Sequence, residues 1–394
     1  MPDWDSFEDF LDEAIQSPEN KRQGLVDDLL RERMEWPWVQ GDRATFIYIS
    51  MGAKNVALNL DTIKGDPPFA PMTKLEGTAL WYITYEFAED DLLDYMLAVD
   101  DPMTPVATEK DIIGRISRHW RVDPMNPVKM STTQMSVSIL RMDNSRPFPD
   151  WKKLNRIPRG NTYEHAINSN ELAFTDRKLW VYTPPGYDEE ETYPLLILQD
   201  GQWGVGPLQI PSIADALIKH NQMQPIIIAM VQSGDQKDRI RTYVSNDKHY
   251  NFLLTELLPF LQSQYSVDSD DLGIGGVTVG AIAAAHAALK NPAAFSRLIM
   301  ISPPLGKGVA QDKLIEYAQR FEDSPVLPKR IFQSVGRYEV KTRFYYPAKM
   351  LNHVLQQRDD VANQYVEIGS GHGLVGFRSV VPEALAWAFP GDNS

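Results

Sequence analysis

The first 35 residues carry apolar side chains at the spacing of amphipathic helices. The recurring apolar positions are Phe7, Phe10, Leu11, Ala14 and Ile15, followed by Leu25, Leu29 and Leu30. Intervals of three and four residues are the period of one helix face. The pair Ser17-Pro18 separates the two sets. Because proline interrupts a helix, the pattern predicts two short helices within residues 1–40.

From about residue 40 the hydrophobic period changes to two. Four short segments alternate apolar and polar residues, namely 44–50 (ATFIYIS), 55–61 (NVALNLD), 79–87 (ALWYITYEF) and 93–100 (LDYMLAVD). In the third segment Trp81, Ile83 and Tyr85 fall on one face, and Tyr82 and Thr84 fall on the other. Short alternating strands with turn residues between them are typical of a β-sandwich. We therefore expect a sandwich domain over residues 41–125.

A third pattern begins after a segment rich in proline and asparagine, residues 126–165, which we interpret as a linker. Continuous apolar runs then alternate with helical stretches. The runs lie at 177–185, 193–201, 225–232, 272–276, 297–302, 330–336 and 364–372. Such runs indicate a parallel sheet covered by helices on both faces, so residues 166–394 are predicted to form an α/β domain.

Composition narrows the class of protein. The chain has 394 residues, 43% of them hydrophobic, which is enough for two or three cores. A net charge of −14 disfavours nucleic acid and anionic membranes as partners, and no apolar run is long enough to span a bilayer. The chain has no cysteine and an acidic N-terminus unlike a signal peptide. We expect a soluble, cytoplasmic protein; the sequence indicates no oligomeric state.

The candidate chemistry follows the predicted strands of the α/β domain. The turn Gly276-Val277-Thr278-Val279-Gly280 has the form G-x-T-x-G and lies between an apolar strand and an alanine-rich helix. Glu339 and His372 follow two later strands. Ligands of such sheets bind at the carboxyl ends of the strands. The chain order nucleophile, acid, histidine is that of α/β-hydrolases.

Each of these residues has a distinct chemical task in acyl transfer. Thr278 would attack a carbonyl carbon, His372 would accept the hydroxyl proton, and Glu339 would orient the imidazole. The N–H of Val279 would face the developing oxyanion. A second donor would come from the loop after the strand at 193–201, at Gln202 or Trp203.

Several segments resemble the enterochelin (iron-siderophore) esterases, within the esterase D branch of the α/β-hydrolases. The resembling motifs are VYTPPGYDEEETYPLLILQDGQWG, RIRTYVSND, FLLTELLPFL, GIGGVTVGAIAA, VGRYE and GSGHGLVGFRSVVPEALAWAFP, with ATFIYIS, LWYITYEF and DPMNP before them. The resemblance covers roughly residues 40–390. It implies an N-terminal sandwich, similar to early-set domains, and a C-terminal domain that hydrolyses esters of a catecholate trilactone.

Carried over by position, the resemblance implies that Thr278 stands where the family has its serine, and that His372 and Glu339 match the histidine and the acid. It also implies that Arg239 meets an anionic substrate. The sequence departs from the family at Thr278, at Ala281 in place of the elbow's usual second glycine, and at Thr242 in place of a glutamate.

The residue at position 278 leaves two readings open. An elbow nucleophile normally adopts positive φ, whereas the β-branched run Val277–Val279 favours extended backbone. The extra methyl group also restricts the rotamers that aim the hydroxyl. One hypothesis is an ester or lactone hydrolase with weak or altered activity. The alternative is a pseudoenzyme that binds a siderophore or another small ligand in the same cleft. A carbohydrate-linked esterase is a further alternative.

Side chains near the predicted strand ends are candidates for substrate binding. Arg239, Arg241 and Arg337 would form a basic mouth for an anionic ligand, unless they pair with nearby carboxylates such as Glu339. Trp203 would line an aromatic pocket. The histidines other than His372 show no metal-ligand spacing, so no metal or cofactor is implied.

Overall fold

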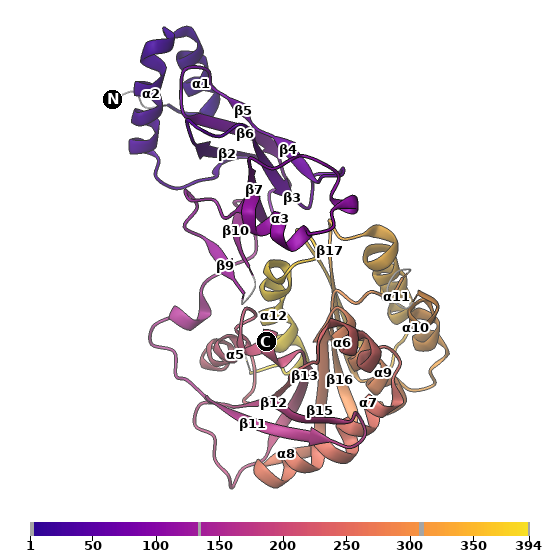
Figure 1. Cartoon of the computed structure of the whole chain (residues 1–394). Coiled ribbons are helices and arrows are strands. Elements are labelled where there is room, and N and C mark those ends of the chain that lie inside the picture. The colour runs from indigo at the N-terminus through magenta and orange to yellow at the C-terminus, as the bar shows by residue number, and fades with distance from the viewer. Residues whose placement is uncertain (1–3, 133–134, 307–310, 393–394) are drawn as a thin grey trace. The chain divides into compact units, whose positions relative to one another are not determined.

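The computed structural model describes residues 4–132, 135–306 and 311–392. The chain forms two compact units (Figure 1). Unit 1 comprises Met1–Arg146 together with Gly369–Val375, and unit 2 comprises Pro147–Ile368 and Gly376–Ser394. The short segment Gly369–Val375 therefore groups with unit 1, although the chain on both sides of it belongs to unit 2.

Unit 1 begins with the two predicted helices, α1 (Phe7–Gln16) and α2 (Glu19–Glu32). The Ser6 hydroxyl caps α1 by accepting the Asp9 N–H at 3.1 Å. The apolar faces of both helices form one core with residues of the first sheet. Its fully buried members include Phe10, Val26, Leu29, Ile47 and Leu80.

Two antiparallel sheets follow the helices. The first has the order β1-β2-β6-β5 and the second β4-β3-β7-β10-β9, with β8 paired to β7. The strands are β1 (Trp38–Gln40), β2 (Arg43–Ile49), β3 (Val56–Leu60), β4 (Phe69–Pro71), β5 (Thr73–Lys74), β6 (Leu80–Glu86), β7 (Leu92–Val99), β8 (Trp120–Arg121), β9 (Lys129–Ser131) and β10 (Ser136–Arg141). A short helix, α3 (Ile112–His119), and a 3₁₀ turn, η1 (Val106–Thr108), lie between β7 and β8.

The two sheets pack face to face, as the alternating pattern predicts. Phe46 of β2 and Tyr95 of β7 are in edge-to-face contact, with ring centroids 4.9 Å apart. The opposite face of the first sheet is covered as well, since the ring centroids of Phe7 on α1 and Tyr82 on β6 are 5.3 Å apart. Both faces of β6 are therefore partly buried, which is why its alternation does not separate an inner from an outer face. The likeness of this unit to early-set domains stays a prediction.

Unit 2 contains an eight-stranded sheet of order β11-β12-β14-β13-β15-β16-β17-β18. The pairs from β14 to β18 are parallel, and β11 and β12 form an antiparallel edge. The strands are β11 (Asn161–Ser169), β12 (Phe174–Thr183), β13 (Tyr193–Gln199), β14 (Ile227–Val231), β15 (Val267–Val277), β16 (Phe295–Ile301), β17 (Arg330–Gly336) and β18 (Ala362–Ile368). Each of the seven predicted runs overlaps one strand of this sheet.

Helices connect the strands. They are α4 (Gly201–Val205), α5 (Ile210–Lys219), α6 (Gln236–Tyr243), α7 (Asp247–Phe252), α8 (Leu258–Gln264), α9 (Val279–Lys290), α10 (Gln311–Asp323), α11 (Tyr346–Gln356) and α12 (Leu374–Ala388). The turn η2 (Trp151–Lys153) is 3₁₀-helical, and η3 (Leu253–Leu257) and η4 (Lys341–Tyr345) are π-helical.

The helix α9 follows the candidate nucleophile and is buried on all sides. Every residue from 279 to 288 is buried, and the helix packs on β13, β15 and β16. A helix that is apolar all round belongs inside a core, and its alanines allow close approach to the sheet. The predicted turn at position 278 is thereby supported on both sides.

Two predicted boundaries need correction. Residues 126–165 are not simply a linker, because β9 and β10 pair within the second sheet of unit 1 and β11 begins at Asn161. β11 is mostly exposed on the edge of the sheet, so it lacks the apolar run that marks the other strands. The run predicted at 364–372 is a strand only as far as Ile368.

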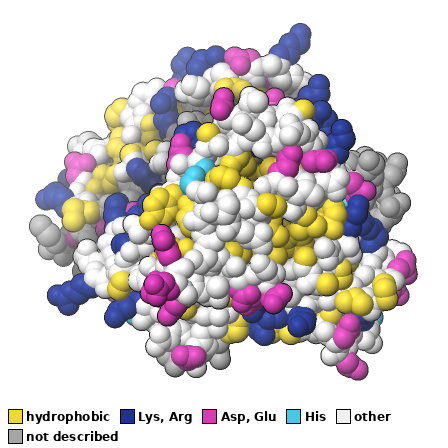
Figure 2. All heavy atoms as spheres, turned by 90° about the horizontal axis from the view of Figure 1, so that it is seen from below, with side chains coloured by type: hydrophobic (Ala, Val, Ile, Leu, Met, Phe, Trp, Pro, Cys, Tyr) yellow, Lys and Arg dark blue, Asp and Glu magenta, His cyan; other side chains and the backbone are white. Residues whose placement is uncertain are grey.

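Acidic and basic side chains are intermixed with apolar ones on the face shown in Figure 2. This face therefore gathers no single sign of charge. Within the described residues, no helix is both long and apolar enough to cross a membrane.

Candidate active site

Thr278 occupies the turn between β15 and α9 with φ 53° and ψ −123°. This conformation is strained for any residue with a side chain and more so for a β-branched one, at a cost of roughly 1–3 kcal/mol. The turn is held by hydrogen bonds on both sides, from Thr278 N–H to the Ile301 carbonyl at 2.9 Å and from Ala281 N–H to the Thr278 carbonyl at 3.0 Å. The β-branched run therefore does not abolish the strained elbow.

The two glycines of the G-x-T-x-G motif stand where a side chain would clash, Gly276 with the backbone of α9 and Gly280 with the Asp200 carboxylate. A Cβ on Gly276 would lie 2.4 Å from the carbonyl carbon of Gly280, and a Cβ on Gly280 would lie 2.8 Å from Asp200 Oδ2. The next position needs no glycine, since Ala281 fits there fully buried. The departure from the family at Ala281 leaves the turn intact.

The hydroxyl of Thr278 is bound by a buried arginine. Arg239 on α6 donates from Nη2 to Thr278 Oγ1 at 2.9 Å, and also to the Val277 carbonyl at 3.3 Å. The same guanidinium forms a bidentate pair with Asp200, from Nε to Oδ1 and from Nη2 to Oδ2, each at 2.7 Å. Arg239 is 5% exposed and Asp200 is fully buried.

Aromatic rings enclose this ion pair. The guanidinium of Arg239 lies 4.7 Å from the ring centroid of Trp203 and 5.8 Å from that of Tyr243. The Tyr243 hydroxyl also accepts the Asp200 N–H at 3.4 Å. Stacking on aromatic faces favours a desolvated cation. Trp203 thus contacts the arginine that binds the Thr278 hydroxyl.

Glu339 is fixed by two hydrogen bonds to one carboxylate oxygen. Its Oε1 accepts the Ser302 hydroxyl at 2.5 Å and the Gly336 N–H at 2.9 Å, and the residue is 2% exposed. Ser302 follows β16 and also has positive φ, 49°. The contact of Ser302 with Glu339 was not predicted from the sequence.

The backbone N–H groups predicted to bind the oxyanion differ in whether they already donate a hydrogen bond within the protein. Val279 is the first residue of α9, so its N–H has no acceptor within the helix. The Trp203 N–H already donates to the Asp200 carbonyl at 2.8 Å inside α4. Gln202 is anchored by its side chain, whose Nε2 donates to Ser233 Oγ at 2.7 Å. Of the two loop candidates, Gln202 is the better placed to offer a backbone donor.

His372 lies on the segment Gly369–Val375, which groups with unit 1. The Gly369 carbonyl accepts the N–H of Leu92 on β7 at 2.8 Å. Thr278 and Glu339 are thus carried by unit 2, whereas the predicted base is carried by unit 1.

The three predicted substrate-binding arginines do not share one environment. Arg239 is buried, whereas the Arg241 side chain is 74% exposed and pairs with Asp238 at 2.8 Å. Arg337 Nε lies 3.5 Å from Glu367 Oε1. Positions two residues apart on a helix face in nearly opposite directions, so Arg239 and Arg241 do not form a common basic mouth. The partner considered for Arg337 was Glu339, and the ion pair seen here is with Glu367.

Asp200 was also missed. The loop DGQW was considered only as a source of backbone donors, yet its aspartate anchors Arg239 from 39 residues away. Across the described parts of the chain, no three histidine, aspartate or glutamate side chains gather in a way that could hold a metal ion.

The parallel sheet, the strained strand-to-helix turn at Thr278 and the buried carboxylate after a later strand are typical of the α/β-hydrolase fold. Residues 169–374 match the family described as putative esterase, and the chain belongs to that family. The chain is 24% identical over 238 residues to the iron(III) enterobactin esterase of Dickeya dadantii, a match covering 57% of this chain and 54% of the relative. A second iron(III) enterobactin esterase, from Escherichia coli K12, is 24% identical over 244 residues, covering 57% and 58%. The chain therefore spans little more than half the length of these curated relatives.

Solved structures extend the likeness to both units. The ferric enterobactin esterase of Salmonella typhimurium matches with a TM-score of 0.75 at 16% identity, covering 92% of this chain and 98% of the other. The enterobactin esterase of Shigella flexneri, crystallised in the presence of enterobactin, matches with a TM-score of 0.73 at 18% identity, covering 91% and 97%. At these identities the matches establish a shared fold. The resemblance to enterochelin esterases inferred from the sequence is confirmed.

Proposed function

We propose that this protein hydrolyses ester or lactone bonds of a bulky, anionic or aromatic siderophore, with Thr278 as nucleophile. The proposal is based on the backbone conformation of Thr278 and on the hydrogen bond to its hydroxyl. Thr278 keeps the strained elbow, φ 53°, although a β-branched side chain disfavours it, and its Oγ1 is bound by Arg239 at 2.9 Å. Strain maintained by surrounding contacts is typical of functional sites.

In the proposed reaction Thr278 Oγ attacks the carbonyl carbon while His372 accepts its proton. The Val279 N–H and the Gln202 N–H stabilise the oxyanion. Collapse breaks the ester C–O bond, and His372 returns the proton to the leaving alcohol. A water molecule, deprotonated by His372, then attacks the acyl carbon. The bond between that carbon and Thr278 Oγ1 breaks, the carboxylic acid leaves, and His372 returns the proton to Oγ1. Glu339, held by Ser302, orients the imidazole and offsets its charge.

Arg239 answers the main objection to a threonine nucleophile. A β-branched side chain restricts χ1, and a misplacement of about 1 Å can cost roughly a hundredfold in rate. The Nη2 hydrogen bond holds Oγ1 in one position, and the cation favours negative charge on that oxygen. We therefore assign Arg239 as a positioning residue for Thr278 in place of the predicted contact with an anionic substrate.

The substrate class is suggested by the relatives. The curated matches carry the name iron(III) enterobactin esterase, and the Shigella flexneri structure was determined in the presence of enterobactin. A catecholate trilactone is therefore the first substrate to test. Any iron would arrive as part of this substrate.

The alternative of a ligand-binding pseudoenzyme stays a prediction. It starts from the same residue, because Thr278 replaces the serine of the family pattern. The carbohydrate-linked esterase also stays a prediction.

The test compares the wild-type protein with Thr278→Ser and Thr278→Val, using an activated aryl ester and the trilactone. Valine matches threonine in shape and lacks only the hydroxyl, so it should abolish turnover while the melting temperature stays nearly unchanged. Serine should change the rate, and His372→Ala should abolish it. Turnover by Thr278→Val would show a different nucleophile. A silent wild type that binds the trilactone, with activity gained in Thr278→Ser, would establish the pseudoenzyme.

A further inference from the structure

The segment that carries His372 lies against carboxylates of unit 1. A Cβ on Gly371 would lie 1.5 Å from Asp61 Oδ2, and a Cβ on Gly373 would lie 2.9 Å from Asp94 Oδ1. Since a carbon–carbon bond is about 1.5 Å, the Asp61 oxygen is within roughly 3 Å of the Gly371 Cα. Each glycine that flanks His372 therefore lies close to a carboxylate, because a glycine has no side chain that would keep the carboxylate away.

The sandwich brings these two acids together. Asp61 directly follows β3 and Asp94 lies on β7, and the antiparallel register pairs Leu60 with Tyr95. One step further along this register Asp61 is opposite Asp94. The hydrogen bond from Leu92 N–H to the Gly369 carbonyl joins the segment to the same strand, β7. The two carboxylates and the backbone contact therefore form one binding surface for the segment, here called the seat, at the end of β3 and the start of β7.

This seat is unfavourable for the stability of unit 1. Asp94 Oδ1 is buried and has no hydrogen-bond partner among the residues that the structure describes. Burial, together with the charge of Asp61, raises the pKa of Asp94 to about 6. Because the pKa is higher in the folded state than in the unfolded chain, stability is full at low pH and is lost as the pH rises through about 6. An acid kept where it opposes folding at neutral pH is typical of functional positions.

We propose that Asp61 and Asp94 are positioning residues for His372, so that the sandwich unit holds the general base of the reaction. This inference rests on the proposed function of His372. When His372 takes the proton of Thr278 it becomes a cation, and the two acids beside its flanking glycines favour that charge in that place. Asp61 and Asp94 would fix the position of the segment and stabilise the positive charge on His372. Thr278 and Glu339 perform the remaining chemistry.

The first test measures turnover and stability together in Asp94→Asn and Asp61→Asn. Loss of a positioning partner should lower kcat by about 10–100-fold with KM changed far less, as for other groups that orient a reacting side chain. Stability of Asp94→Asn at pH 7 should equal or exceed that of the wild type. A merely structural residue would show a joint loss of activity and stability. Glu86→Gln, an exposed carboxylate on the other sheet, is the matched control and should change neither.

A second measurement separates this inference from the proposed function. The imidazole nitrogens are followed by NMR in protein labelled with ¹⁵N-histidine, with His372→Ala identifying the His372 signal among seven histidines. Asp94→Asn and Asp61→Asn should shift or broaden that signal, and Glu86→Gln should leave it unchanged. An unchanged His372 signal in both aspartate variants would overturn the inference, whatever the activity. A moved signal in a protein without esterase activity would support the seat and contradict only the proposed reaction.

Discussion

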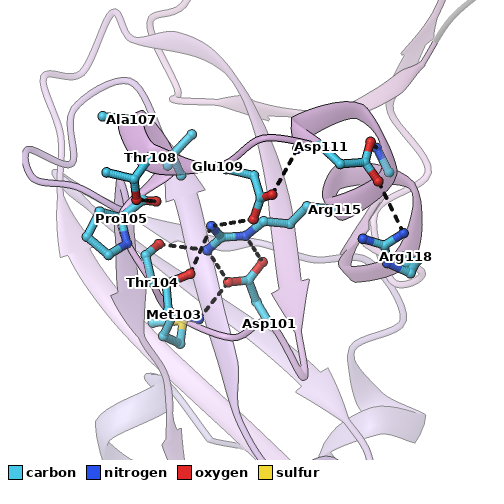
Figure 3. A network of polar contacts seen from close by, with 12 residues as sticks. Asp101, Met103, Thr104, Pro105, Ala107, Thr108, Glu109, Asp111, Arg115 and Arg118 are labelled. Carbon is cyan, nitrogen blue, oxygen red and sulfur yellow. Dashed lines mark hydrogen bonds and ion pairs between the residues drawn. The ribbon is translucent and has the colours of Figure 1, made fainter.

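Each unit contains a buried arginine–aspartate pair among its described residues, and the two pairs serve different ends. In unit 1, Arg115 of α3 forms a bidentate pair with Asp101, from Nε to Oδ2 at 3.0 Å and from Nη2 to Oδ1 at 2.6 Å (Figure 3). Its other contacts are internal: Nη2 donates to the Thr104 carbonyl at 2.9 Å, and Nη1 lies 3.8 Å from Glu109. The contacts of this guanidinium in Figure 3 connect it to residues 101–109 and stabilise that loop.

In unit 2 the pair of Arg239 with Asp200 has the same bidentate form and similar burial. Here a further donor bond goes to the hydroxyl of Thr278, a residue at φ 53°. The ion pair itself is therefore no sign of function. Both guanidiniums also donate to a carbonyl and to a threonine hydroxyl: Arg115 to the carbonyl and Oγ1 of Thr104, and Arg239 to the Val277 carbonyl and Thr278 Oγ1. The difference lies in the bound threonine, because Thr278 has positive φ, 53°, and Thr104 does not.

The largest expected effect is on stability, in Arg115→Ala. Removing one partner of a buried ion pair leaves Asp101 uncompensated and should cost about 3–5 kcal/mol in the free energy of unfolding. Turnover per folded molecule should not change. Denaturant titration and active-site-normalised kinetics check this, and a large fall in kcat would show that the two pairs are not separate in role.

Arg239→Lys should affect catalysis more than stability. Lysine keeps the charge near Asp200 and cannot hold the carboxylate and Thr278 Oγ1 together. We expect kcat to fall about a hundredfold, the scale of a nucleophile displaced by about 1 Å. Arg115→Lys is the matched control and should leave kcat unchanged. Equal kcat in both lysine variants would contradict the assignment of Arg239.

Acid should weaken the two regions at different pH. His249 is buried, its ring centroid is 5.1 Å from that of Tyr243, and burial lowers its pKa to about 3. The unfolded chain then binds a proton at higher pH than the folded one, so stability is lost as the pH falls below about 6.5, by roughly 2 kcal/mol at pH 5. His249→Phe should remove this loss, as measured by denaturant unfolding at pH 7 and pH 5.

The Arg115–Asp101 pair in unit 1 should keep its stabilising effect down to a lower pH. Burial by itself would raise the pKa of Asp101, but hydrogen bonds from Arg115, Met103 and Trp120 lower it below its ordinary value of 3.8. Its contribution is present above the unfolded pKa and is lost only as the pH falls through the lower folded value. A pH 5 stability loss that persists in His249→Phe would contradict the assignment to His249.

The smallest expected effect is that of Ser302→Ala. Loss of the hydroxyl removes one of the two donors that fix Glu339 Oε1, and kcat should fall about tenfold through a less well oriented histidine. KM should change far less than kcat, and both are measured in steady-state assays with the aryl ester. An unchanged kcat would show that the Ser302 hydroxyl does not help to orient the histidine.

Much of the fold follows from local patterns. The helices α1 and α2 and the four alternating strands of unit 1 were predicted from periodicities of 3.6 and 2. Seven strands of unit 2 were predicted from continuous apolar runs. The position of the elbow was predicted from its glycines, because only small residues let β15 and α9 approach at Gly276 and Gly280. These features are encoded within a few neighbouring residues.

What was missed depends on contacts between distant residues. The chain separates Asp200 from Arg239 by 39 residues and Ser302 from Glu339 by 37, so no local spacing marks either pair. The placement of Gly369–Val375 with unit 1 is equally invisible, because it rests on Asp61 and Asp94, more than 250 positions earlier in the chain. β9 and β10 were taken for a linker because their short segments lie among prolines and asparagines.

The most direct test of the central claim is to trap the acyl-enzyme and locate it. The protein is mixed with an activated aryl ester, quenched with acid, and digested for peptide mass spectrometry. The account predicts an acyl group on Thr278 in the wild type, a lower yield in Arg239→Lys, and none in Thr278→Val. An adduct on another residue, or no adduct while the trilactone binds stoichiometrically, would contradict it.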